Sequence, residues 1–245
     1  MKKMKFAALF AALISVISLS SCLNDSSSDG YDGGAVVSLK SYLGSYYYIT
    51  DDGVSLFPEN TNVLAGLKLK DGTYLERFYG VFKLSEGEAI SPNKTSYKIS
   101  ELAISDYIVY QPMTTMPDTI KANHGIQDID GKLWAANGYL NIPVLFFTSP
   151  TSKVNAYDFQ AYATGASKDT LFVTLQQSRN IEANDYPVTS PQLLSFSMPF
   201  GKSDFENIFR QVQPKNDTLV IKVSAKVHGK NVPIVRTTKY KASQR

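Results

Sequence analysis

Apolar and polar residues alternate over short stretches of this chain, and glycine, proline, asparagine and aspartate separate the stretches. Residues 219–227 are the clearest case, because an apolar residue occupies every second position and lysine or serine occupies most of the others. Successive side chains of a β-strand point to opposite faces, so this period of two predicts a strand with one buried face. The chain also contains 15 tyrosines and 13 phenylalanines, which favour strands. We therefore predict an all-β protein.

The order of strand and turn signals predicts two domains. Hairpin signals within residues 45–57 and 67–82, followed by one or two strands before Pro112, are compatible with a small Greek-key barrel of the OB-like kind in residues 36–115. Turn-forming residues then interrupt the pattern. Roughly seven further strands predict a C-terminal β-sandwich in residues 116–245. One short helix is expected there, because Ser203 and Glu206 stand in a capping-box arrangement.

A run of three tyrosines in the first predicted hairpin is a candidate ligand face. If Tyr47 joins Ile49 in the core, Tyr46 and Tyr48 face outward, where their rings can stack on a sugar or a base. The alternative is that these rings pair across strands as ordinary sheet aromatics. The sequence leaves both interpretations open.

The N-terminus has the three parts of a secretory signal peptide: three lysines, a short apolar run over residues 6–17, and small residues. The segment Leu19-Ser20-Ser21-Cys22 then resembles the lipobox of bacterial lipoproteins, in which the cysteine thiol is lipidated and the signal peptide is cut just before it. We expect a signal peptide in residues 1–21, a lipid anchor on Cys22 and a flexible tether over residues 22–35. Cys22 is the single cysteine, so no disulfide forms within the chain.

Loss of the signal peptide changes the charge balance. The full chain has 25 basic and 22 acidic residues, and the removed segment contains three lysines and no acid. The mature chain is therefore formally neutral, which gives no support for a nucleic-acid partner and makes carbohydrate or protein the better ligand prediction. Asp25, Asp29 and Asp32 resemble the acid-rich stretch of surface-exposed Bacteroidetes lipoproteins, which implies an outer-membrane location and surface exposure.

The sequence shows no constellation of catalytic residues, and we expect no catalytic residue, no metal and no cofactor. His124 and His228 are far apart in the chain and are expected to be exposed loop histidines rather than zinc ligands. Neither a G-x-S-x-G elbow nor a glycine-rich phosphate loop is present. A glycosidase carboxylate pair could lie among turn residues such as Asp51 and Asp52, or Asp128 and Asp130, but sequence does not supply their separation.

Three Asp-Thr-aliphatic tripeptides resemble the O-glycosylation acceptor of the Bacteroidetes. This resemblance implies glycans on Thr119, Thr170 and Thr218. So short a motif also recurs by chance, and the intact mass of the protein from its native host tests the assignment.

Several segments resemble the NigD-like lipoproteins of Bacteroides and Prevotella. They are the lipobox, YYYITDDGVSLFPENTNV (46–63), IDGKLWAANGYLNIPVLFF (129–147), and the later LSFSMP and LVIKVSAKV, in this order. The resemblance covers nearly the whole chain and implies an OB-like domain followed by a β-sandwich. The family name implies a bacteriocin immunity role, and the family supplies no catalytic residues.

Together these observations predict a surface-exposed envelope lipoprotein that binds a protein or a glycan without catalysis. The alternatives are an immunity protein that blocks a toxin at the envelope, and a glycan-acting enzyme whose carboxylate cleft is not visible in the sequence.

Overall fold

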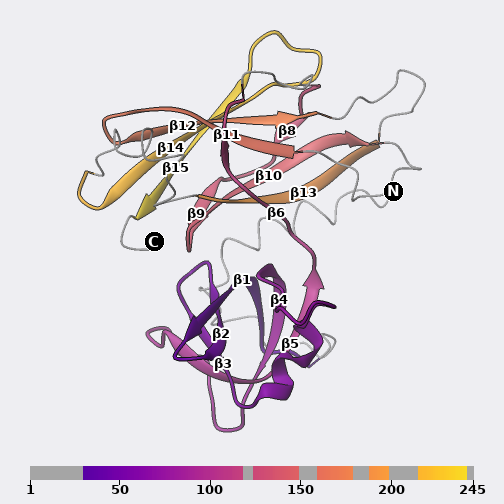
Figure 1. Ribbon diagram of the computed structural model, residues 1–245, viewed down its shortest axis with the longest axis vertical. Coiled ribbons are helices and arrows are strands. Elements are labelled where there is room, and N and C mark those ends of the chain that lie inside the picture. Colours follow the sequence, from indigo (N-terminus) through magenta and orange to yellow (C-terminus); the bar gives the residue numbers. More distant parts are fainter. Residues whose placement is uncertain (1–29, 118–123, 149–158, 179–187, 199–214, 242–245) are drawn as a thin grey trace. The chain divides into compact units, whose positions relative to one another are not determined.

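The computed structural model of the chain describes residues 30–117, 124–148, 159–178, 188–198 and 215–241 (Figure 1). The chain divides into two compact units, residues 1–107 and 108–245. The division lies before the expected boundary at residue 115, because two short strands that follow it pair with strands of the second unit: Val109–Pro112 pairs with Val188–Ser197, and Thr114–Thr115 pairs with Phe159–Ser167. Each unit is described by itself.

The first unit is a closed five-stranded barrel with strand order β1-β2-β3-β5-β4, in which β4 also pairs with β1. A short 3-10 helix, η1, lies between β3 and β4. This five-stranded barrel confirms the predicted OB-like domain. The elements are β1 (Gly33–Tyr42), β2 (Ser45–Thr50), β3 (Ser55–Pro58), η1 (Thr61–Leu67), β4 (Arg77–Leu84) and β5 (Ser96–Asp106).

Helix η1 immediately precedes the second hairpin expected in this unit and shares Leu67 with it. Its side chains Val63, Leu64 and Leu67 are buried, and the Asn60 side chain caps it by accepting a hydrogen bond from the Asn62 N–H. Apolar residues spaced in this way lie on one side of a helix, whereas a strand would place neighbouring positions on opposite faces. The predicted strand before the Asp71-Gly72 turn is reduced to a single bridge between Lys68 and Tyr74.

The second unit is a β-sandwich, as predicted. One sheet has the order β6-β13-β10-β8, with β9 also paired to β10, and the other has the order β15-β14-β12-β11-β7. One core cluster contains buried residues from both sheets. The strands are β6 (Val109–Pro112), β7 (Thr114–Thr115), β8 (Asp128–Ile129), β9 (Trp134–Ala136), β10 (Tyr139–Thr148), β11 (Phe159–Ser167), β12 (Thr170–Gln177), β13 (Val188–Ser197), β14 (Thr218–Ala225) and β15 (Ile234–Lys241).

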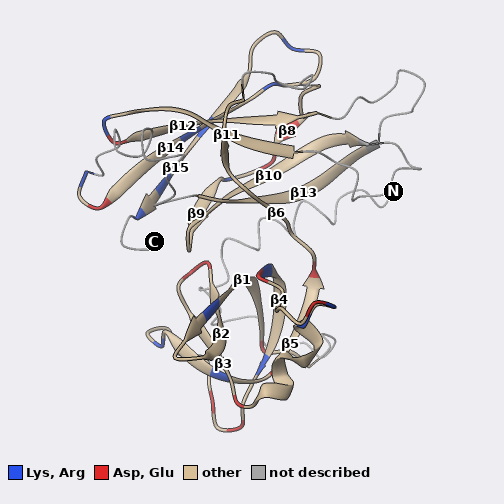
Figure 2. Cartoon of the chain, in the orientation of Figure 1, with Lys and Arg blue, Asp and Glu red and all other residues tan. Residues whose placement is uncertain are grey.

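The predicted alternation of buried and exposed residues is confirmed most directly in β14. Every second residue from Leu219 to Val227 is buried, and Lys222 and Lys226 are exposed. Lysine and arginine positions occur along β14 and β15 (Figure 2). The helix expected around Ser203 lies outside the described residues.

Candidate functional site

The tyrosine run lies in β2, and its orientation is the reverse of the predicted one. Tyr48 is fully buried, so the expectation that Tyr48 faces outward is wrong. Its hydroxyl donates a 2.7 Å hydrogen bond to the backbone oxygen of Leu75, and its ring meets that of Phe78 edge-on at 5.3 Å. Burial, with a smaller contribution from Tyr74, raises the pKa of Tyr48 well above its usual range, so the hydroxyl remains a donor. Tyr48 belongs to the barrel core.

Tyr46 lies on the same face of β2 as Tyr48, but it remains 45% exposed. Tyr46 is next to the β1–β2 turn, at the end of the strand, where the barrel no longer encloses it. Its ring lies 5.0 Å from that of Tyr74 in a tilted arrangement. On the opposite face of β2, Tyr47 stacks on Phe57 of β3 with ring centroids 4.8 Å apart, and Phe57 is 43% exposed. Strand β2 therefore presents aromatic rings on both faces.

The β1–β2 turn adds two exposed apolar side chains to these rings. Tyr42 is 70% exposed and Leu43 is 87% exposed. Leu43 has a φ of 49° and is followed by Gly44 at 81°. A non-glycine residue with positive φ is disfavoured by about 1–2 kcal/mol, and the exposed Leu43 side chain adds little packing to offset that strain. We call the side chains of the turn and of the adjoining outer face of β2 and β3 the hairpin surface: Tyr42, Leu43, Tyr47 and Phe57.

The turn residues of this surface were not predicted from the sequence. The available signal was the segment Ser41-Tyr42-Leu43-Gly44-Ser45, in which apolar residues occupy a position that usually carries asparagine, aspartate or glycine. An apolar residue at a hairpin turn is solvent-exposed by geometry, so it is available for a contact outside the barrel.

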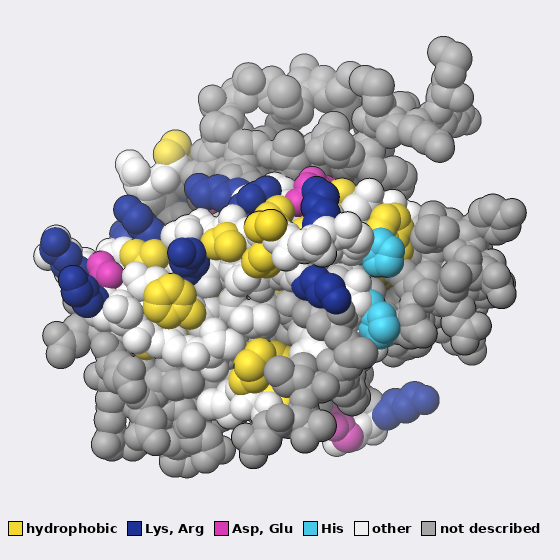
Figure 3. Space-filling view, turned by 90° about the horizontal axis from the view of Figure 1, so that it is seen from above, with side chains coloured by type: hydrophobic (Ala, Val, Ile, Leu, Met, Phe, Trp, Pro, Cys, Tyr) yellow, Lys and Arg dark blue, Asp and Glu magenta, His cyan; other side chains and the backbone are white. Residues whose placement is uncertain are grey.

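The two histidines approach each other in the second unit. Nδ1 of His228 lies 3.4 Å from the backbone oxygen of His124, and the His228 ring meets Phe147 at 5.3 Å. Both histidines are visible in Figure 3, which shows the unit from above. Among the described residues, no group of three or more histidine, cysteine, aspartate or glutamate residues could hold a metal ion.

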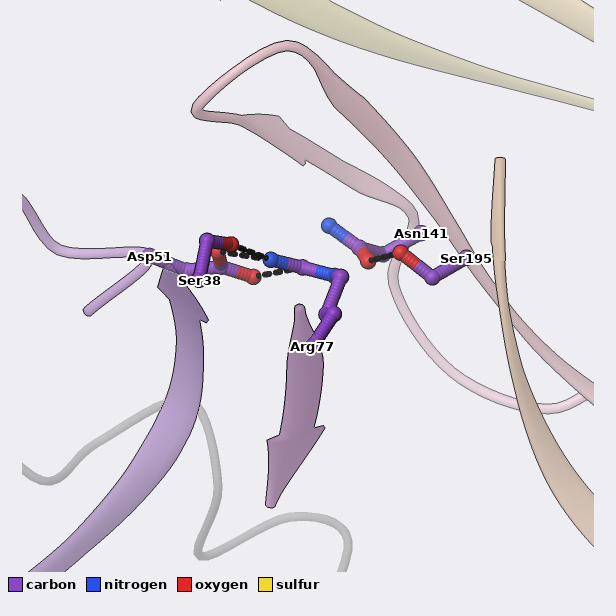
Figure 4. Close-up of polar contacts among 5 residues, drawn as sticks. All are labelled: Ser38, Asp51, Arg77, Asn141 and Ser195. Atoms are coloured by element: carbon purple, nitrogen blue, oxygen red, sulfur yellow. Dashed lines mark hydrogen bonds and ion pairs between the residues drawn. The ribbon is translucent and has the colours of Figure 1, made fainter. Parts of the chain in front are cut away.

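A buried ion pair fixes the β2–β3 turn of the barrel (Figure 4). The Arg77 guanidinium donates to both carboxylate oxygens of Asp51, at 3.0 and 2.7 Å, and also to the Ser38 hydroxyl. The Arg77 side chain is 0% exposed. Asp51 is thus committed to a structural pair and is not a free carboxylate beside Asp52. Burial, and secondarily the Asp51 charge, raise the pKa of Asp52.

A second buried polar pair joins two strands of the sandwich. The Ser195 hydroxyl of β13 donates a 2.8 Å hydrogen bond to Oδ1 of Asn141, its cross-strand partner in β10 (Figure 4). Both side chains are fully buried. The pair satisfies polar groups inside the sheet, and buried polar groups of this kind stabilise one strand register.

Thr170 and Thr218 occupy matching positions, because each is the first residue of one of the neighbouring parallel strands β12 and β14. Both are partly exposed. The Thr170 hydroxyl donates to the Asp169 carboxylate at 3.2 Å, and that of Thr218 to the Asn216 backbone oxygen at 3.3 Å. Their glycosylation stays a prediction. Cys22 and Thr119 lie outside the described residues.

Comparison with protein-family models gives no match, and comparison with curated proteins gives none. Solved structures do resemble the chain. A candidate lipoprotein from Bacteroides fragilis shares 13% identity over 86% of this chain and 97% of that chain, with a TM-score of 0.59. A candidate toxin-related protein from Parabacteroides distasonis shares 16% identity over 86% and 94%, with a TM-score of 0.52. A NigD-like immunity protein from Bacteroides caccae shares 15% identity over 85% and 97%, with a TM-score of 0.48.

The structures from Bacteroides fragilis and Parabacteroides distasonis share the fold of this chain. At such low identity they show a shared fold, and the function has to be argued from the surfaces of this chain. Within the described ranges, no helix combines the length and apolar character that a membrane crossing requires.

Proposed function

We propose that this chain is a lipid-anchored envelope protein whose barrel binds a protein partner through the hairpin surface, without catalysing a reaction. The observation that carries the proposal is the exposed, strained turn at Tyr42 and Leu43, which adjoins the rings on β2 and β3. Strain that contributes nothing to packing is typical of functional positions. In OB-type barrels the face of strands 2 and 3 is a common binding face.

The size and composition of the hairpin surface favour a protein over a small glycan. An aromatic side chain buries about 150–250 Å² when it is covered. Tyr42 is 70% and Leu43 is 87% exposed, so with the exposed parts of Tyr47 and Phe57 they can supply the apolar centre of an interface to which each partner contributes ~800 Å². Tyrosine and phenylalanine are also enriched at the centres of protein interfaces.

Anchoring through Cys22 is part of this proposal and rests on the signal peptide and lipobox pattern. Location at the outer membrane with surface exposure rests on the acidic residues behind the cysteine. Bacteriocin immunity, which the family resemblance implies, is one case of protein binding, in which the partner is the incoming toxin.

Cross-linking in the source cells tests the binding proposal. Wild-type protein, the double variant Tyr42→Ala/Leu43→Asp and the control Ile90→Asp would be purified through a C-terminal tag and their partners quantified by mass spectrometry. Ile90 is 46% exposed on a barrel loop and lies outside the hairpin surface, so its variant controls for loss of an exposed apolar group. We expect one envelope or toxin protein to be lost from the double variant and retained by Ile90→Asp. Equal recovery from all three proteins would contradict the proposal.

Fractionation of cells tests the anchor separately. Cys22→Ser removes the thiol that would carry the lipid, so we expect the variant to leave the membrane fraction. A wild-type mass without an added lipid would contradict anchoring and would leave the hairpin proposal intact.

A further inference from the structure

The sheet β15-β14-β12-β11-β7 has an unusual charge composition. Its five strands contain no aspartate or glutamate, but they contain Lys222, Arg236, Lys239 and Lys241. The excess of basic residues extends beyond this sheet. Residues 108–245 contain 15 lysines and arginines and 10 acidic residues, whereas residues 30–107 contain 7 lysines and arginines and 10 acidic residues. The mature chain is therefore formally neutral only because the positive net charge of the second unit is offset by the negative net charge of the rest of the chain.

The strand register places three of these lysines on the outer face of the sheet. Lys222 is opposite Thr237, Lys239 is opposite Val220, and Lys241 is opposite Thr218, while the residues between them on β14 are buried in the core. Lys239 and Lys241 are thus about 7 Å apart along one strand. Lys222 and Lys239 are diagonal neighbours about 7–8 Å apart. All three are exposed and have no ion-pair partner within the described part of the chain.

Aromatic and hydroxyl side chains occupy the rest of this face. Phe172 of β12 and Tyr162 of β11 point outward and are half-buried. Phe172 is opposite Gly165, where an added Cβ would meet nothing within 4 Å, so one flank of the ring is open. Phe172 is the direct neighbour of Lys222, which is followed by Thr237 on β15, and the hydroxyl residues Thr174 and Ser224 lie in the adjacent row beside Tyr162. Figure 3 shows the resulting mixture of basic and hydrophobic side chains, with few acidic ones in view.

We propose that this basic sheet face, defined by Tyr162, Phe172, Lys222, Lys239 and Lys241, binds an anionic polysaccharide that carries carboxylate or sulfate groups. The lysines supply charge complementarity, the hydroxyls supply donors and acceptors for sugar hydroxyls, and the rings supply flat apolar surface. The proposal concerns a different unit and a different surface from the hairpin surface, so either can fail alone.

The composition of this face favours a polysaccharide over a nucleic acid. A nucleic-acid groove stacks successive bases on its rings, whereas this face has two half-buried rings flanked by hydroxyls. A partner that combines anionic groups with many hydroxyl groups fits the face better.

Direct binding measurements on the chain that follows Cys22 test this inference. The probes are polygalacturonate as a carboxylated glycan, heparin as a sulfated glycan and dextran as a neutral control. We expect binding to at least one anionic glycan, affinity that falls as salt rises, and no binding to dextran. The variant Lys222→Gln/Lys239→Gln/Lys241→Gln should lose about tenfold in affinity, because three exposed charge pairs of about 0.5 kcal/mol each sum to the ~1.4 kcal/mol that corresponds to a factor of ten.

Two further variants make the result specific to this face. The control Lys68→Gln/Lys70→Gln/Lys83→Gln removes the same charge from exposed positions of the barrel and should bind as the wild type does. Phe172→Ser leaves the charge unchanged and should weaken binding several-fold, while the fluorescence of Trp134 checks that the unit remains folded. Equal loss in both lysine variants, no binding to either anionic glycan, or tighter binding of single-stranded DNA or anionic lipid vesicles would each overturn the proposal.

Discussion

Replacement of Tyr48 distinguishes a core role from a ligand-binding role for the tyrosine run of β2. Tyr48→Ala removes a fully buried ring and the donor to the Leu75 carbonyl. Truncation of a buried aromatic residue to alanine costs about 3–5 kcal/mol, and loss of the hydrogen bond adds about 1 kcal/mol. Tyr48→Phe keeps the ring and should cost only about 1 kcal/mol. Tyr46→Ala, at a position that is 45% exposed, should cost less than about 1 kcal/mol.

These free energies correspond to clearly separated melting temperatures. For a unit of about 80 residues, 1 kcal/mol shifts the Tm by roughly 4–8 °C. The barrel transition should therefore fall by at least about 15 °C in Tyr48→Ala, by about 5 °C in Tyr48→Phe, and by a few degrees at most in Tyr46→Ala.

Calorimetry of the chain that follows Cys22 measures these shifts, and one intrinsic probe assigns them to a unit. Trp134 is the single tryptophan and lies in β9 of the second unit, so its fluorescence reports the sandwich and not the barrel. The barrel transition should move while the Trp134 transition stays in place. If Tyr48→Ala melted at the same temperature as Tyr46→Ala, the inward orientation of Tyr48 would be refuted.

Two further pairs of variants test the packing described above. Asp51→Asn leaves a buried arginine without its charge partner and should destabilise the barrel by about 3–5 kcal/mol in urea denaturation. Asp52→Asn should instead stabilise the barrel at pH 7, because a raised pKa disfavours the ionised form in the fold; the gain should vanish below about pH 4, where the carboxyl is protonated in both states. Gly125→Ala would place a Cβ 3.0 Å from backbone atoms after β14 and should lower the Trp134 melting temperature more than Gly131→Ala, which shares a positive φ but meets open space.

The fold could be predicted because most of its elements have unambiguous sequence signals. In β14 the buried and exposed positions differ sharply in polarity, so both the strand and its orientation follow from the sequence. Turn residues at Gly53 and at Asn137-Gly138 adopt the positive φ angles that their residue types favour. Two-residue turn signals and a period of two are local properties of the sequence, so they can be recognised without knowledge of the tertiary structure.

The orientation of β2 could not be predicted in the same way. Residues 46–48 are all tyrosine, which is apolar in its ring and polar at its hydroxyl, so either face of the strand can be buried. The choice depends on closure of the barrel, which brings Phe78 and the Leu75 carbonyl to Tyr48. Helix η1 was missed for a related reason, because seven residues are too few for periodicity to separate a helix from a strand.

Net charge failed as a guide to surface chemistry because it is summed over two units with opposite balances. The alternation that predicts β14 also places Lys222 on the outer face, and the same phase applied to β15 places Lys239 and Lys241 beside it. The absence of acidic residues from all five strands of that sheet is equally visible in the sequence. Charge counted by strand face and by unit would therefore have predicted the basic sheet face, whereas the net charge of the whole mature chain gave no sign of it.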